Sequence, residues 1–280
     1  MPYLIDTHAH LDADIYANEL DIVIKAALSE DVWMVTLGSD YASSVRAVEI
    51  AERYPTGVFA AIGLHPNRVP LDLGSAEKPL QLEKFAELAM HPKVVALGET
   101  GLDFSDLPQG SRGGQEEQLA ERLKASQKVV FGKFLDLSRE LRLPLLLHCR
   151  DAYEDMFGML ETWDKTTRGF DSRGILHGFS GSWKDAKRFF GLDFLISVTG
   201  IIAHGAYQSE LTRKAPLSRL VLESDCPHLT AMPWNLRRSE PGYLPSVLSS
   251  VAGTRREAPE LVAQETTRNA LNVLKKIARS

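Results

Sequence analysis

Length, composition and charge limit what this chain can be. Its 280 residues suffice for one large α/β barrel or two ordinary domains, and a hydrophobic content of 44% provides for a packed core. The formal net charge of -5 gives no overall basic field, which argues against non-specific binding to long duplex nucleic acid. Cys149 and Cys226 are the only cysteines, which favours a reducing compartment.

No apolar stretch approaches the roughly 20 residues that span a bilayer. No charged segment followed by an apolar one opens the chain, as a secretory signal would require. We therefore expect a cytoplasmic protein without membrane contact.

Short apolar runs alternate with segments of helical periodicity along the chain. Strands are predicted over residues 3–5, 32–37, 58–63, 94–98, 143–147, 174–176, 193–198 and 220–222. Helices are predicted over 17–30, 43–53, 80–90, 115–141, 152–163 and 184–190, and after the last strand over 243–251 and 259–277. Alternating strands and helices imply parallel pairing, and eight such units close into a (β/α)₈ TIM barrel. Because no linker divides the chain, we predict a single domain over residues 1–280.

One connection departs from this rhythm. Residues 104–115 are rich in glycine, serine and proline and leave the end of the fourth predicted strand. In a barrel this position is the rim where long loops shape substrate access. A tolerated surface insertion is the other interpretation, and the sequence leaves both open.

A His-x-His pair, His8 and His10, follows the first predicted strand. Alternate side chains of an extended strand share a face, so the two imidazoles can grip one ion. Two surface histidines also fall at this spacing by chance, and the pair alone is weak evidence. The same holds for any single histidine after a strand, which is more often a capping or core residue.

The rest of the chain changes this balance. Five more potential ligands each close an apolar run: His65, Glu99, His148, His177 and Asp225. In a barrel the carboxyl ends of the strands meet at one mouth, so we expect a metal site there. Imidazole and carboxylate without thiolate suit zinc or manganese and leave positions open for water. Seven groups exceed the needs of one tetrahedral ion, and Glu99 can bridge two; we expect two divalent ions, zinc as bound, with magnesium or manganese as alternatives.

These residues lie in motifs that resemble the TatD family of metal-dependent deoxyribonucleases, which are amidohydrolase-like barrels. The resemblance rests on Asp6-Thr7-His8-Ala9-His10-Leu11-Asp12, Gly63-Leu64-His65-Pro66, Gly98-Glu99-Thr100-Gly101-Leu102-Asp103, His148-Cys149-Arg150-Asp151-Ala152, His177-Gly178-Phe179-Ser180-Gly181 and Glu223-Ser224-Asp225-Cys226-Pro227. It implies that His8, His10, Glu99 and Asp225 hold one ion, and that Glu99, His148 and His177 hold the second. It also implies that His65 is a pocket residue near the substrate phosphate.

The chain departs from the family pattern at the rim. The usual Arg-Asn-x-Pro stands here as Arg238-Ser239-Glu240-Pro241, and the loop after Asp103 is longer than in compact members. Both changes bear on substrate shape rather than on the metal site. Asn269 matches the family's closing motif, where we expect a structural hydrogen bond.

Phosphodiester hydrolysis needs an activated water and a clamp for the phosphate, which two divalent ions supply. We expect catalytic roles for Asp225, Glu99 and His65, with Asp225 orienting the water and accepting its proton. His65 and Arg150 are the expected phosphate contacts. An ion pair between Arg150 and Asp151 is an equal alternative.

The loop after the last strand supplies further candidates for substrate binding. Trp234 and Arg238 would offer a stacking face and a cation to a single-stranded end, although Trp234 equally suits loop packing. The resulting hypothesis is a 3′-5′ exodeoxyribonuclease acting on DNA ends or short single-stranded DNA, with no obligate protein partner. Alternatives are a metal-dependent amide or ester hydrolase, acting on a lactone or an aminoacyl-tRNA ester, and a non-enzymatic scaffold that binds a partner.

Overall fold

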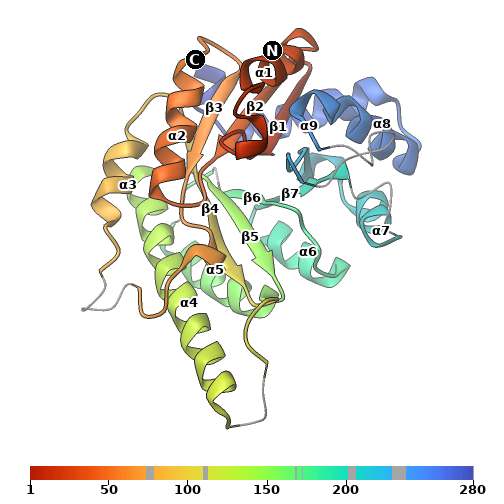
Figure 1. Cartoon of the computed structure of the whole chain (residues 1–280). Coiled ribbons are helices and arrows are strands. Elements are labelled where there is room, and N and C mark those ends of the chain that lie inside the picture. Colours follow the sequence, from red (N-terminus) through yellow and green to blue (C-terminus); the bar gives the residue numbers. More distant parts are fainter. Residues whose placement is uncertain are drawn as a thin grey trace.

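Eight parallel strands close into a barrel in chain order (Figure 1). The computed structural model describes residues 1–73, 79–109, 113–167, 169–171, 173–200, 206–228 and 238–279. The strands are β1 (Leu4–Ala9), β2 (Val32–Leu37), β3 (Val58–Ile62), β4 (Val94–Asp103), β5 (Leu145–Arg150), β6 (Gly174–Leu176), β7 (Leu195–Val198) and β8 (Leu220–Leu222). Pairing of β1 with β8 closes the ring, which confirms the predicted (β/α)₈ barrel.

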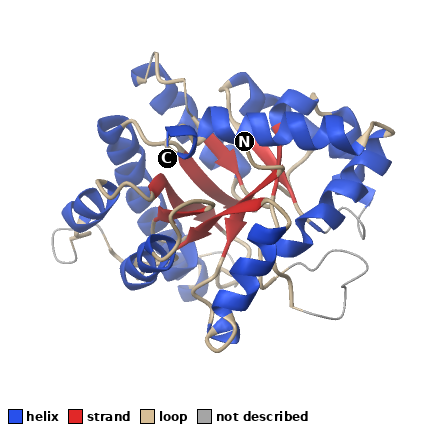
Figure 2. Ribbon diagram, turned by 90° about the horizontal axis from the view of Figure 1, so that it is seen from above, coloured by secondary structure: helices blue, strands red, loops and turns tan. Residues whose placement is uncertain are grey.

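Helices surround the strands on all sides (Figure 2). They are α1 (Leu20–Ser29), α2 (Tyr41–Glu52), α3 (Leu82–Ala89), α4 (Gln115–Leu141), α5 (Tyr153–Thr166), α6 (Trp183–Gly191), α7 (Ala206–Lys214), α8 (Leu244–Arg255) and α9 (Pro259–Val273). Short 3₁₀ turns include η2 (Pro66–Arg68), η4 (Leu217–Arg219) and η6 (Ile277–Arg279). In the part of the chain described above, no helix combines the length and the apolar character needed to cross a bilayer.

Helix α7 was not predicted from the sequence. Its buried side chains include the polar Gln208 and Thr212 beside Leu211, so the helix lacks the apolar periodicity that marks the others. Gln208 instead lies in hydrogen-bonding range of Thr199 and donates to the carbonyl of Phe179 at 3.4 Å. Polar contacts therefore replace the hydrophobic stripe on this helix.

The apolar residues form two separate cores. The larger core lies between the strands and the helices, and the smaller one fills the interior of the barrel. Ile5 and Val95, near the beginnings of their strands, belong to the inner core together with Val273, Leu274 and Ile277 from the carboxyl-terminal end of the chain. The end of α9 therefore closes the amino-terminal mouth of the barrel, and the opposite mouth is left for the site.

Because side chains alternate along a strand, the residues that face the barrel interior can be followed along each strand to the opposite mouth. The inner core includes Ala61 of β3, Leu146 of β5, Ile175 of β6 and Val221 of β8. Residues an even number of positions later share the same face of an extended strand. In these four segments such residues include His65, His148, His177 and Asp225.

In β1 and β4 the register shifts next to the candidate ligands. From Asp6 to Ala9, β1 advances three residues while its partner β2 advances two, and β4 shows the same excess between Leu97 and Thr100 against β5. Each extra residue is a β-bulge, which re-aims the side chains beside it. A Cβ on Gly98 would lie 2.3 Å from the carbonyl oxygen of Leu146, so only glycine permits this approach beside Glu99.

Asn269 has the structural role expected from the closing motif. Its side-chain amide donates to the carbonyl oxygens of Leu217 at 2.9 Å and Leu220 at 2.8 Å. These bonds tie α9 to the turn that leads into β8. They satisfy two carbonyls next to the strand that precedes Asp225.

We predict that Asn269→Ala lowers the free energy of unfolding by about 1–3 kcal/mol, because two carbonyls lose their donor. Asn269→Asp should cost more, since it sets a carboxylate against both carbonyl oxygens. Chemical denaturation measures both effects. Arg268→Ala, which removes an exposed ion pair with Glu265 on the same helix, is the control and should change stability by less than about 0.5 kcal/mol. Equal stability of all three variants would contradict the assigned role.

Candidate metal centre

Four side chains from β1, β4 and the segment after β8 face one point at the mouth of the barrel. The Nε2 atoms of His8 and His10 lie 3.1 Å apart, and Glu99 Oε2 lies 3.4 Å from the first and 3.5 Å from the second. Asp225 Oδ1 lies 3.8 Å from His8 Nε2 and 3.9 Å from His10 Nε2. The structure thus brings together the first ligand set expected from the sequence.

The other oxygen of Glu99 faces a second group of histidines. Its Oε1 lies 2.8 Å from His148 Nδ1 and 3.5 Å from Nε2 of both His177 and His65. His65 Nε2 and His148 Nδ1 lie 3.2 Å apart. One carboxylate therefore borders both sets, each through a different oxygen.

Hydrogen bonding assigns a donor role to His65. The backbone N–H of Asn67 donates to His65 Nδ1 at 3.1 Å, so this nitrogen carries the lone pair. In the neutral ring the proton then sits on Nε2, the atom that faces Glu99 and the cavity. This arrangement suits a donor to a substrate oxygen, as expected for a pocket residue.

Two carboxylates that the sequence analysis gave no role orient the metal-site imidazoles. His148 Nε2 donates to Asp103 Oδ2 at 2.9 Å, and His177 Nδ1 donates to Glu223 Oε1 at 3.0 Å. Each bond leaves the opposite ring nitrogen facing Glu99, which is the usual way in which outer carboxylates set a metal-binding imidazole. The alternation of side chains along a strand could have indicated Glu223, because it lies two residues before Asp225 and so shares its face.

Electrostatics favour positive charge in the cluster. Burial raises the pKa of Glu99, but the imidazoles of His8, His65 and His177 outweigh burial and hold this pKa well below its usual range. Burial lowers the pKa of His177, but Glu223, Asp225 and Glu99 raise it to about 10. The opposite holds for His10, where burial followed by the neighbouring His8 lowers the pKa to about 3, so this ring is neutral with a lone pair to offer.

The spacing of the ligand atoms fits a metal ion. Bonds of about 2.0–2.1 Å from zinc to nitrogen or oxygen place the corners of a tetrahedron about 3.3 Å apart. The atoms of the first set are separated by 3.1–3.9 Å where they face each other. His8 Nδ1, on the far side of the ring, is buried without a hydrogen-bond partner within the described residues.

Backbone bonds hold Asp225 beside β1. Its N–H donates to the carbonyl of His8 at 3.0 Å, and the N–H of His10 donates to the carbonyl of Cys226 at 2.8 Å. Asp225 has a φ of 49°, a left-handed conformation that aspartate and asparagine tolerate better than most residues. The carboxylate is therefore fixed by the chain on both sides.

The cluster opens into a cavity of about 380 Å³. Its described lining residues are His10, Asp12, Ala13, Ser39, His65, Arg68, Glu99, His148, His177, Asp225 and His228. The sequence analysis gave no role to Ser39, Arg68 or His228. None of residues 104–109 or 113–115 contributes, so the described part of that long loop lies outside the cavity wall.

The other residues expected to bind substrate are Arg150, Arg238 and Trp234, and their surroundings differ. Arg150 is exposed at the end of β5, and within the described ranges its side chain forms no ion pair with Asp151 or another acid. Arg238 is paired with Glu19 and with Glu240, and its guanidinium lies over the ring of Tyr16. Trp234 falls outside the described residues. Substrate roles for all three stay predictions.

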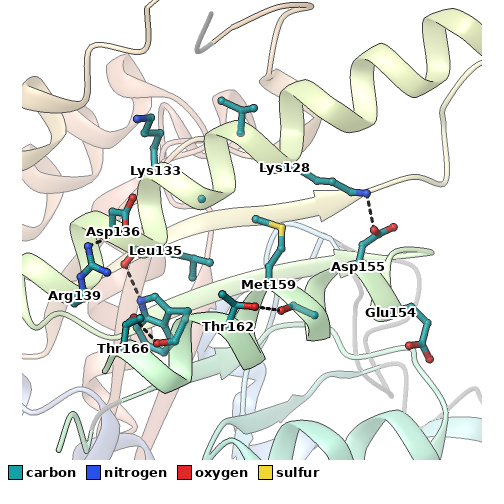
Figure 3. Close-up of a pocket in the computed structure, with 14 residues that line it drawn as sticks. Lys128, Lys133, Leu135, Asp136, Arg139, Glu154, Asp155, Met159, Thr162 and Thr166 are labelled. Atoms are coloured by element: carbon teal, nitrogen blue, oxygen red, sulfur yellow. Dashed lines mark hydrogen bonds and ion pairs between the residues drawn. The ribbon is translucent and has the colours of Figure 1, made fainter. Parts of the chain in front are cut away.

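A larger hollow of about 700 Å³ lies between α4 and α5, on the outside of the barrel (Figure 3). Lys128 and Asp155 form an ion pair across it, and Trp163 donates to the carbonyl of Leu135 at its side. Its lining includes neither histidine nor cysteine. It is separate from the metal centre.

The fold and the site together define a class. A (β/α)₈ barrel with imidazole and carboxylate ligands at the carboxyl ends of its strands is the architecture of a metal-dependent hydrolase. The profile of the TatD related DNase family matches residues 5–275. The chain belongs to this family and is a metal-dependent nuclease, a hydrolase of ester bonds.

Individual relatives agree with this assignment. The chain is 35% identical to an uncharacterized metal-dependent hydrolase, YabD, of Bacillus subtilis, over 95% of this chain and 97% of the relative. It is 32% identical to the 3′-5′ ssDNA/RNA exonuclease TatD of Klebsiella pneumoniae, over 95% of each chain. The crystal structure of YjjV, a TatD homologue of Escherichia coli, superimposes with a TM-score of 0.79 at 27% identity over 97% of both chains.

We predict that Glu99→Gln loses metal at both ligand sets, because one carboxylate borders both. Metal content measured after dialysis against a metal-buffered solution tests this. Glu223→Gln is the matched control: it removes an acid that orients His177 but lies outside the shared position, so affinity should weaken at one set only, by about 10–100-fold. Retention of full metal content by Glu99→Gln would contradict the shared role.

Proposed function

We propose that the protein is a 3′-5′ exonuclease that removes nucleotides from single-stranded DNA ends with two divalent metal ions, zinc as bound and magnesium or manganese as alternatives. The observation that carries this proposal is the pair of ligand sets on the two oxygens of Glu99. The name of the Klebsiella relative supports the polarity and the substrate.

The two sets of ligands divide as the family resemblance implies. His8, His10, Glu99 and Asp225 would hold one ion, and Glu99, His148 and His177 the second. Bound divalent ions of this kind supply charge stabilisation for the phosphate and lower the pKa of water toward 7.

Two residues act directly on the reactants. His65 donates its Nε2 proton to a non-bridging oxygen of the phosphate and holds it in the cavity. Asp225 turns one oxygen toward His8 and His10, and its other oxygen accepts the proton of the attacking water. Glu99 fixes the distance between the two halves of the site.

The size and charge of the site favour a strand end over duplex DNA. A cavity of about 380 Å³ is near the lower limit for small-molecule pockets and suits a terminal nucleotide. The formal net charge of -5 supplies no broad attraction for a duplex. A short single strand can enter with its 3′ end first.

We expect the metal-loaded protein to release mononucleotides from single-stranded DNA with a free 3′-hydroxyl and to spare the same strand with a blocked 3′ end. Denaturing electrophoresis of 5′-labelled strands measures both. A panel of lactones and aminoacyl esters serves as the control for the ester-hydrolase alternative. Turnover of the esters without nucleotide release would contradict the proposal, and so would inactivity on every substrate.

Asp225→Asn should lower kcat by roughly 10²–10⁴ with a much smaller effect on KM, because the proton acceptor is lost while asparagine keeps the left-handed backbone. His65→Ala should mainly raise KM. Steady-state kinetics on a single-stranded oligonucleotide separate the two effects. Asp193→Asn is the matched control, since Asp193 is also left-handed, with a φ of 60°, and lies on the surface. Turnover of Asp225→Asn at the parent rate would refute the assigned role.

A further inference from the structure

Arg68 is the one side chain with a permanent positive charge among the described residues that line the cavity. It is exposed at the end of η2, three residues after His65. Its own backbone N–H donates to the carbonyl of His65 at 2.8 Å. The residue is therefore fixed directly beside the imidazole that we assign to the scissile phosphate.

The turn that carries Arg68 is anchored on both sides. The His65 ring accepts the N–H of Asn67, and the Asn67 side chain donates to Asp103 at 3.3 Å. Asp103 in turn holds His148. The backbone position of Arg68 is thus set by the same hydrogen bonds that orient the metal centre. Its side chain therefore starts from a fixed point at the mouth.

No carboxylate oxygen of the described residues lies within 4.0 Å of this guanidinium, so it forms no ion pair, although Asp40 is near enough for Arg68 to help lower the pKa of that carboxyl. The neighbouring Asp40 is engaged at the start of α2, where it accepts from the N–H and the hydroxyl of Ser43. Arg46 is paired with Asp12, and Arg238 with Glu19 and Glu240, whereas Arg150 at the end of β5 is unpaired but does not line the cavity. An unpaired arginine in a cavity for a polyanion is suited to an anionic group of the substrate.

The cluster around Glu99 receives the scissile phosphate, and the side chain of Arg68 forms no hydrogen bond or ion pair with a described ligand of that cluster. In a strand that enters with its 3′ end first, the next phosphate toward the mouth is the one on the 5′ side. We propose that Arg68 binds this flanking phosphate, so that the enzyme recognises a strand by two consecutive phosphates. The inference rests on the proposed exonuclease function and adds a determinant for substrate choice.

A double-mutant cycle between the protein and the substrate tests the contact. The two substrates are a single-stranded hexanucleotide and the same strand with an uncharged methylphosphonate at the linkage on the 5′ side of the scissile bond. For the parent enzyme, loss of the flanking charge should lower kcat/KM by about tenfold or more, as for a charge-assisted hydrogen bond. Arg68→Ala should show the same loss on the native strand and no further loss on the methylphosphonate strand.

The loss should fall on KM, with kcat within about twofold, because the contact is present before and during the reaction. Arg68→Lys, which keeps the charge without the planar fork, should recover part of the affinity. Arg53→Ala removes an exposed, paired arginine at the end of α2 and should behave as the parent on both strands.

Equal losses from Arg68→Ala on both strands would place the contact at the scissile phosphate and overturn the proposal. No loss on either strand would overturn it as well. Failure of the metal-loaded parent to cleave the native strand would instead refute the exonuclease function itself, so the two failures are distinguishable.

Discussion

The two oxygens of one buried carboxylate, Glu99, face nitrogen atoms of five histidines at 2.8–3.5 Å. A charge with a side-chain exposure of 3% needs close partners, because burial of an unpaired carboxylate costs several kcal/mol. Burial lowers the pKa of His177, but Glu223, Asp225 and Glu99 raise it to about 10, so without a metal ion this ring is a protonated partner of Glu99. Metal uptake at this centre therefore releases protons.

The apolar cores of the barrel stabilise the fold independently of the polar groups gathered at its mouth. Two apolar cores, one inside the barrel and one outside it, pack without help from the site, and the end of α9 closes the far mouth. Bulges in β1 and β4 then aim His8 and Glu99 at a common point. The outer carboxylates Asp103 and Glu223 orient His148 and His177 through hydrogen bonds from the scaffold.

The sequence predicted all eight strands because buried parallel strands are apolar runs, but it ended the fourth at residue 98 and the fifth at 147, whereas β4 continues to Asp103 and β5 to Arg150. His148 in β5 and His177 directly after β6 follow inward-facing residues by strict alternation, so the sequence could place both candidate ligands at the mouth. His8 is different. Ile5 faces the interior, so alternation alone would favour Thr7, and only the extra residue in β1 brings His8 into position. A local bulge of this kind depends on pairing with β2 and is invisible in the sequence of β1.

The role of cations at the mouth was equally hard to predict. The chain has 32 lysines and arginines, and the sequence does not show which of them lack an acidic partner. Arg238 was expected at the substrate but is paired with two glutamates, whereas Arg68 lines the cavity without one. Ion pairs between residues such as Glu19 and Arg238 arise only from the tertiary structure.

Anomalous diffraction from crystals of the protein loaded with manganese or zinc would show how many ions bind at the mouth of the barrel and which side chains surround each. We expect two peaks, one beside each oxygen of Glu99, with His8, His10 and Asp225 around the first and His148 and His177 around the second. A single peak, or two peaks of which one has no contact with Glu99, would contradict this expectation.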